Sequence, residues 1–199
     1  MKSHGWTCDH ARVQVTGSVL RSRVLFVRSK GGDAWPRVLA QLEPGTREEA
    51  KAGFLETRWY PYDMLVDLSS TTDRVLGDGD MALCHQMGRF SCEMTLTTVH
   101  RLLLKFGNLG HLVDRAATAW RTQFDAGEII VHEKHRDLYV FEVRGVSKPH
   151  RAHCTAITGW MERAVELSGE DAFDFEVKCR AEGNPYCMWT FTRASLRSG

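Results

Sequence analysis

The stretch FDFEVKCRAEGNPYCMWTFT (residues 173–192) decides the fold predicted for this chain. Apolar and polar residues alternate in its two halves, which is the pattern of half-buried strands. Between the halves, residues 180–186 contain glycine, asparagine and proline, which favour chain reversal. The sequence therefore predicts a C-terminal β-hairpin with strands at 173–179 and 186–192.

Four side chains in and before this hairpin form a candidate metal site. Cys179 and Cys187 bracket the turn. Glu176 lies three residues before the first of these cysteines, and Cys154 belongs to the preceding predicted helix. Three thiolates and a carboxylate could close a tetrahedral shell around zinc, and a closed shell is structural rather than catalytic.

Alternatives to this zinc site stay open. Strand alternation puts Glu176 and Cys179 on opposite faces, so a shared ion requires a bulge or a strand end between them. His153, next to Cys154, is an alternative ligand. In a chain without metal, the cysteines would be small buried residues or oxidised thiols, and Glu176 a surface carboxylate.

Outward from the hairpin, the sequence predicts an α+β fold in a single domain. Residues 128–133 and 138–143 have the pattern of an earlier hairpin, and a helix over 152–167 separates the two hairpins. A helical portion precedes them. We expect residues 1–10 to be a flexible lead and residues 11–195 to form the domain.

The N-terminal half is predicted from helix-start signals. Valines alternate over residues 11–19, which indicates a first strand. Asp33 is a candidate helix cap, Thr46 and Glu49 have the spacing of a capping box, and Pro61 suits a first helical turn. Further helices are predicted over residues 80–90, 96–106 and 109–124.

Composition excludes several classes of protein. The chain has 199 residues, a formal net charge of +1 and 43% hydrophobic residues. No basic stripe is present to neutralise phosphates, which argues against nucleic-acid binding. No apolar run has membrane-spanning length, and the N-terminus lacks the apolar core of a signal peptide. We therefore expect a cytoplasmic protein whose six cysteines serve metal ligation or burial rather than disulfides.

Motifs of common enzyme classes are missing from the sequence. It contains no Gly-x-Ser-x-Gly elbow, no phosphate-binding loop and no Gly-x-Gly-x-x-Gly after a predicted strand. We expect a chain without enzymatic activity.

The element order, with Glu-x-x-Cys-x₇-Cys at residues 176–187 and Cys154 upstream, resembles the four-vinyl-reductase-type domain. That family includes sensor domains of phenol-responsive bacterial activators, whose structural zinc is held by three cysteines and one glutamate. Its fold is related to haem nitric-oxide/oxygen-binding (H-NOX) domains and to small TRAPP subunits. Over its whole length, through residues 58–61 and 106–127, the chain also resembles myxobacterial paralogues without an assigned activity.

The resemblance implies a pocket for a small apolar or aromatic molecule between the helices and the sheet. It also implies a homodimer that signals to a separate partner protein. A well-packed aromatic core is the alternative. The candidate ligand-binding residues are Trp59, Tyr60, His100, Phe106 and Trp120.

His100 lies on a predicted helix, as a proximal haem ligand would. The chain lacks the Tyr-x-Ser-x-Arg stretch that grips haem propionates in the gas-sensing relatives. The sequence therefore disfavours haem and favours structural zinc as the cofactor.

These observations predict a non-enzymatic cytoplasmic sensor or adaptor that binds a small apolar or aromatic ligand. The first alternative is a constitutive interaction scaffold, like the TRAPP subunits, without an exchangeable ligand. The second is a haem-based gas sensor or an accessory of tetrapyrrole metabolism.

Overall fold

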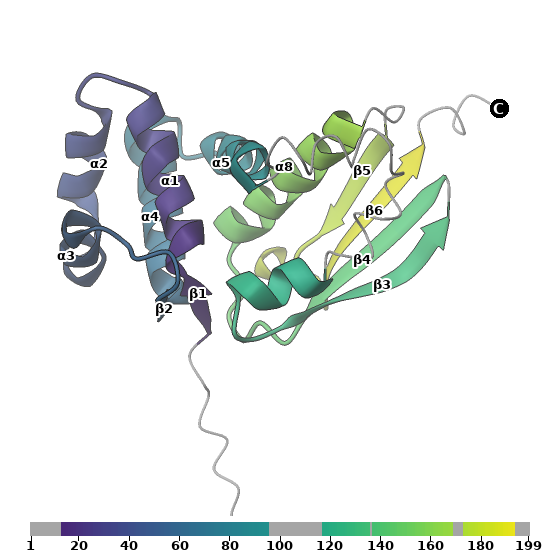
Figure 1. The fold of residues 1–199 in the computed structure, drawn as a ribbon. Coiled ribbons are helices and arrows are strands. Elements are labelled where there is room, and N and C mark those ends of the chain that lie inside the picture. The colour runs from purple at the N-terminus through teal and green to yellow at the C-terminus, as the bar shows by residue number, and fades with distance from the viewer. Residues whose placement is uncertain (1–12, 96–116, 136, 169–172, 194–199) are drawn as a thin grey trace, which may run out of the picture.

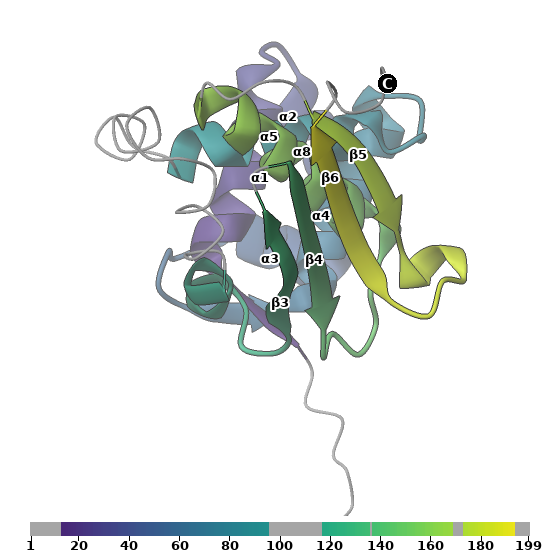
Figure 2. The ribbon, with the colours of Figure 1, turned by 90° about the vertical axis from the view of Figure 1, so that its right-hand side faces the viewer.

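Helices and an antiparallel sheet form two layers in the computed structural model, which describes residues 13–95, 117–135, 137–168 and 173–193. The helical layer lies on the left in Figure 1 and the sheet on the right, with helix α8 (Arg151–Ser168) between them. Figure 2 shows the sheet in front of α8. The predicted α+β class is confirmed.

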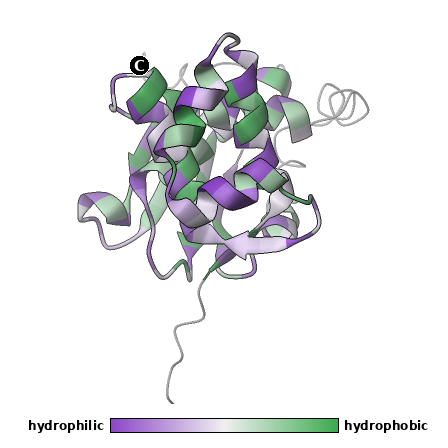
Figure 3. Cartoon of the chain, turned by 90° about the vertical axis from the view of Figure 1, so that its left-hand side faces the viewer, coloured by the Kyte–Doolittle hydropathy of each residue, from purple (hydrophilic) through white to green (hydrophobic). Residues whose placement is uncertain are grey.

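The helical layer is built from the N-terminal half of the chain. Short strands β1 (Gln14–Thr16) and β2 (Trp59–Pro61) pair antiparallel beside it. Figure 3 shows hydrophilic and hydrophobic residues interspersed on these helices, as expected where each buries one face. The helices of this layer are α1 (Gly17–Ser29), α2 (Ala34–Gln41), α3 (Pro44–Ala52), α4 (Tyr62–Leu76) and α5 (Ala82–Thr95).

Both predicted hairpins are confirmed, and they combine into one sheet with the strand order β3-β4-β6-β5. Strand β4 pairs with β6, so the second hairpin adds to the edge of the first. A short 3-10 turn (Arg180–Glu182) follows β5, and residues 117–123 are helical. The strands are β3 (Glu128–His135), β4 (Leu138–Arg144), β5 (Phe173–Lys178) and β6 (Cys187–Arg193).

Two N-terminal predictions are corrected by the structure. The first strand covers only Gln14–Thr16, because α1 begins at Gly17. The capping box is wrong: α3 begins at Pro44, two residues before Thr46. Proline has the backbone φ of a helix and needs no donor in the first turn, so it starts the helix earlier than the threonine would.

The sheet buries alternate residues. On β6, Cys187, Trp189 and Phe191 are each at most 2% exposed. The indole N–H of Trp189 donates a 2.9 Å hydrogen bond to Oγ1 of Thr158 on α8. The period-2 alternation that predicted the hairpin therefore also produces the apolar face of the sheet on which α8 packs.

Helices α5 and α8 join the two layers at a close crossing. A Cβ on Gly88 would lie 1.9 Å from the carbonyl oxygen of Ala156, and a Cβ on Gly159 would lie 2.1 Å from that of His85. Two glycines thus let the backbones touch directly.

Ion pairs connect α5 and α8 on the solvent-exposed side of the same crossing. Arg89 donates two hydrogen bonds, of 2.8 and 2.7 Å, to the carboxylate of Glu166, and Arg163 donates a third at 2.7 Å. The hydrogen bonds from Arg89 are the main cause that lowers the pKa of Glu166 from 4.5 to about 2. A depressed pKa in the folded state stabilises the fold at pH values above 4.5, and this contribution is lost as pH falls towards 2.

We expect Glu166→Gln to destabilise the chain near pH 6 by about 1 kcal/mol, since Glu166 is partly solvent-exposed and screened. Urea unfolding of wild type and variant at several pH values between 6 and 2 measures the difference. The difference in unfolding free energy between wild type and variant should decrease as the pH falls and approach zero near pH 2. Glu48→Gln, which removes an exposed pair with Lys51 within α3, is the control. A difference for Glu166→Gln that stays constant with pH would contradict this assignment.

Candidate functional site

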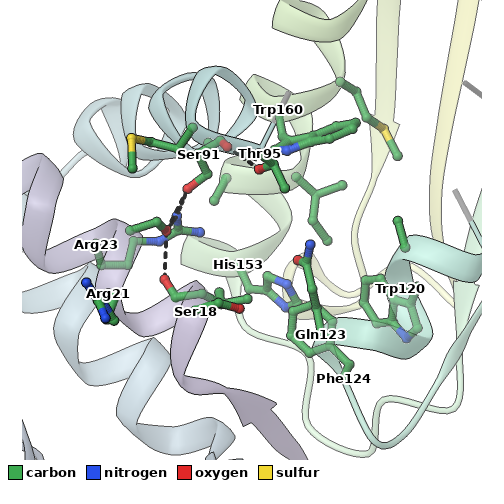
Figure 4. Close-up of a pocket in the computed structure, with 18 of the residues that line it drawn as sticks. Ser18, Arg21, Arg23, Ser91, Thr95, Trp120, Gln123, Phe124, His153 and Trp160 are labelled. Atoms are coloured by element: carbon green, nitrogen blue, oxygen red, sulfur yellow. Dashed lines mark hydrogen bonds between the residues drawn. The ribbon is translucent and has the colours of Figure 1, made fainter. Parts of the chain in front are cut away.

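A cavity of about 310 Å³ lies between the helical layer and α8. Figure 4 shows polar side chains from α1 and α5 on one side and aromatic rings on the other. Its volume is at the lower end of small-molecule pockets. The lining residues are Ser18, Val19, Arg21, Ser22, Arg23, Leu25, Glu56, Gly88, Ser91, Met94, Thr95, Ala119, Trp120, Gln123, Phe124, Ile129, His153, Ala156, Ile157, Trp160 and Met161.

Stacked rings form the apolar wall. Trp120 and Phe124 stack with ring centroids 4.3 Å apart, and the imidazole of His153 lies 5.0 Å from the Phe124 ring. The indole N–H of Trp120 donates to the carbonyl of Ala126 at 3.1 Å, which fixes the ring. This wall suits a flat apolar or aromatic molecule.

His153 contributes an imidazole to the cavity wall. Its Nδ1 shares a 2.9 Å hydrogen bond with the hydroxyl of Tyr62 from α4. No hydrogen bond to its Nε2 is found among the described residues. Burial, and then the positive charge of Arg23, lower the pKa of His153 to about 3, so the ring is neutral near pH 7. It offers a ligand one uncharged polar atom.

A second site is formed by three cysteines, one on α8 and two at the last hairpin. The Sγ atom of Cys154 lies 3.0 Å from that of Cys179 and 3.9 Å from that of Cys187, and all three lie within 4.8 Å of one another. Thiolates around one tetrahedral metal ion at 2.3 Å are about 3.8 Å apart. The spacing thus suits a thiophilic metal ion.

Hydrogen bonding among the three cysteines favours the thiolate form of Cys179 and Cys187 and the protonated form of Cys154. Hydrogen bonds with Cys179 and Cys187 raise the pKa of Cys154. The hydrogen bond from Cys154 is the main cause that lowers the pKa of Cys187 to about 6, helped by the backbone N–H of Arg180. Thiolates at the hairpin are the form in which cysteine binds metal.

Glu176, the predicted fourth ligand, does not join the cysteines. Its side chain is 59% exposed and lies 3.5 Å from Nζ of Lys178. Cys179 follows the end of β5 and turns inward, whereas Glu176 stays on the solvent face within the strand. No bulge corrects the alternation in the pairing of β5 with β6. His153, the alternative ligand, is not part of the cysteine group either.

The predicted ligand-binding residues divide into three cases. Trp120 lines the cavity. Trp59 and Tyr60 do not, because β2 pairs with β1 away from the cavity and packs Tyr60 against Phe54. His100 and Phe106 lie outside the described residues.

Arg23 and His153 are the cavity residues that sequence reasoning missed as ligand contacts. Arg23 belongs to the buried stripe of α1, with Leu20 one turn before and Val27 one turn after. A charged residue in such a stripe is a signal that the sequence contained, because arginine is rarely buried without a partner.

Comparisons with known proteins extend these findings. No family model matches the chain, and no curated protein matches it by sequence. None of the described helices combines the length and apolar character needed to cross a membrane. The resemblance to the four-vinyl-reductase-type domain stays a prediction.

Solved structures do match. An Fe(II) unliganded H-NOX protein from K. algicida is 12% identical with a TM-score of 0.67, covering 89% of this chain and 95% of that chain. An H-NOX protein from S. oneidensis in the Fe(II)NO state is 14% identical with a TM-score of 0.66, covering 88% and 97%. Likeness at these identities shows the fold, and it confirms the expected relation to the H-NOX fold.

The same neighbours correct the cofactor prediction. A further match, 10% identical with a TM-score of 0.61 over 89% of this chain and 99% of that chain, comes from work on heme redox potential and porphyrin distortion. The fold is therefore one that holds haem in other proteins. The prediction that haem is disfavoured was wrong because it relied on one missing motif and not on the fold.

Proposed function

We propose that this chain is a non-enzymatic small-molecule sensor domain whose ligand binds in the cavity between α1, α5 and α8. The observation that carries the proposal is the cavity itself: an apolar, ring-lined space of about 310 Å³ between two layers of the fold. Binding there changes the position of the helical layer relative to α8. The domain acts as a homodimer, and a separate partner protein that contacts the dimer responds to this change.

In this proposal, the cysteine group connects α8 rigidly to the last hairpin. Cys154 and His153 are neighbours on α8, so one residue faces the thiols and the next faces the cavity. Tyr62 contacts His153, and burial, together with the nearby thiols, raises the pKa of its hydroxyl. A thiophilic metal ion held by the three cysteines would fix α8 to the last hairpin and thereby hold His153 in place.

The proposal predicts that filling the cavity abolishes binding. Indole, a small aromatic probe, should bind wild type, and Ile157→Trp should weaken it at least about tenfold because the new ring occupies the ligand's space. Isothermal calorimetry measures the affinity, and thermal unfolding checks the fold.

Leu55→Trp is the control, since Leu55 is 63% exposed and does not line the cavity. It should bind indole as wild type does. A folded wild type that binds neither indole nor haemin would sink the sensor proposal and favour the constitutive scaffold.

Haem is a second candidate ligand, favoured by the iron-containing H-NOX neighbours. The described residues contain donors of the right types: the imidazole of His153 for iron and the guanidinium of Arg23 for a propionate. Bound haem iron would supply a site for a diatomic gas. Titration with haemin decides: an absorption band of bound haem that changes in His153→Ala but not in His85→Ala favours haem.

A further inference from the structure

Arg23 places a positive charge in the wall of the apolar cavity. It lies in the middle of α1 on the buried stripe and is 5% exposed. Figure 4 shows it beside Ser91, across the cavity from Trp120 and Phe124. Burial lowers the pKa of its guanidinium to about 10, which leaves the group charged near pH 7.

The protein contacts of Arg23 are neutral and few. Its Nη1 reaches the hydroxyl of Ser91, the hydroxyl of Ser22 at 3.2 Å and the carbonyl of Met87 at 3.4 Å. Its Nε is buried without a partner, and none of the described residues accepts from Nη2. A guanidinium has five N–H donors, so most of this one's capacity is unused.

No carboxylate among the described residues forms an ion pair with Arg23. Among the described residues that line the cavity, one is acidic, Glu56, and it pairs with Arg21 at 3.1 Å. Burying a charge without a counter-charge is costly.

We propose that the ligand of this cavity is an apolar or aromatic acid, whose single carboxylate binds Arg23 while its apolar body lies against Trp120, Phe124 and Trp160. The inference rests on the proposed small-molecule function and narrows it to a chemical class. A carboxylate has the charge that the site lacks, and guanidinium–carboxylate hydrogen bonds are among the strongest that proteins make. The hydroxyls of Ser22 and Ser91, themselves 2.8 Å apart, hold the guanidinium in position.

The test compares indole-3-acetate with indole-3-acetamide, which has nearly the same shape and no charge. Wild type should bind the acid about tenfold more tightly, the gain of a hydrogen-bonded charge pair over a neutral contact. In Arg23→Met this preference should vanish while binding of the amide persists. Arg28→Met, which removes an exposed arginine of α1 that does not line the cavity, should keep the preference.

A second measurement does not depend on ligand binding. Without ligand, Arg23→Met should unfold at the same temperature as wild type or higher, because methionine removes an uncompensated buried charge and keeps the apolar bulk. If wild type binds the amide as tightly as the acid, or Arg23→Met keeps the preference, the inference is overturned and the sensor proposal stands. If indole and both derivatives fail to bind, the apolar-ligand proposal and the inference fall together.

Discussion

Replacing Gly88 by alanine is expected to destabilise the chain by about 3 kcal/mol, the upper range for overpacking a buried contact. The new methyl would stand 1.9 Å from the carbonyl oxygen of Ala156, far inside van der Waals contact. The obstacle is backbone, which cannot swing aside as a flexible side chain does. Helices α5 and α8 must separate, and the cavity between them must change shape.

Gly159→Ala probes the same crossing from the other helix, where the methyl would meet the carbonyl of His85 at 2.1 Å. The free energy of unfolding, from urea denaturation, should fall by a similar amount. Gly45→Ala is the control, since a Cβ on Gly45 in α3 meets nothing within 4 Å. Alanine there should be neutral or stabilise by up to about 1 kcal/mol. Equal effects at Gly88 and Gly45 would show that α5 and α8 do not touch as described.

Replacing Cys179 by serine is expected to reduce bound metal from one ion per chain to none and to cost about 4 kcal/mol of stability. The hydroxyl is a poor ligand for a thiophilic ion, and two remaining thiols cannot hold it alone. Loss of the metal ion should also affect the cavity, because Cys154 adjoins His153 on α8. Elemental analysis of purified protein and the thiolate absorption bands of added Co²⁺ measure the site.

Cys92→Ala is the matched control, because Cys92 is also fully buried but lies outside the cysteine group. It should keep the metal. Glu176→Gln should keep it as well, since this carboxylate is exposed and apart from the thiols. Loss of metal in Glu176→Gln would restore the four-ligand site that the sequence suggested. Wild type that binds neither its own metal nor Co²⁺ would identify the thiols as packing residues.

The local patterns of the chain were sufficient for much of the fold. Period-2 alternation predicted both hairpins, and the spacing of Cys179 and Cys187 around a turn brought them opposite α8, where Cys154 meets them. Such features depend on neighbours in sequence or on one hairpin register, which alternation fixes. The strand predicted over residues 11–19 was too long because valines at 13, 15 and 19 suit a strand or a helix equally. In the structure, pairing with β2 ends at Thr16 and α1 begins at the next residue.

The sequence by itself determined the hairpins, the helix between them and the meeting of three cysteines. Only the tertiary structure decided that Glu176 stays outside the cysteine group, that Trp120 lines a cavity while Tyr60 does not, and that Arg23 is buried without a counter-charge among the described residues. The physical reason is distance along the chain. Residues of α1, α5 and α8 line one space because two glycines let α5 and α8 approach and α1 packs against α5. A pattern confined to neighbouring residues carries no record of those contacts.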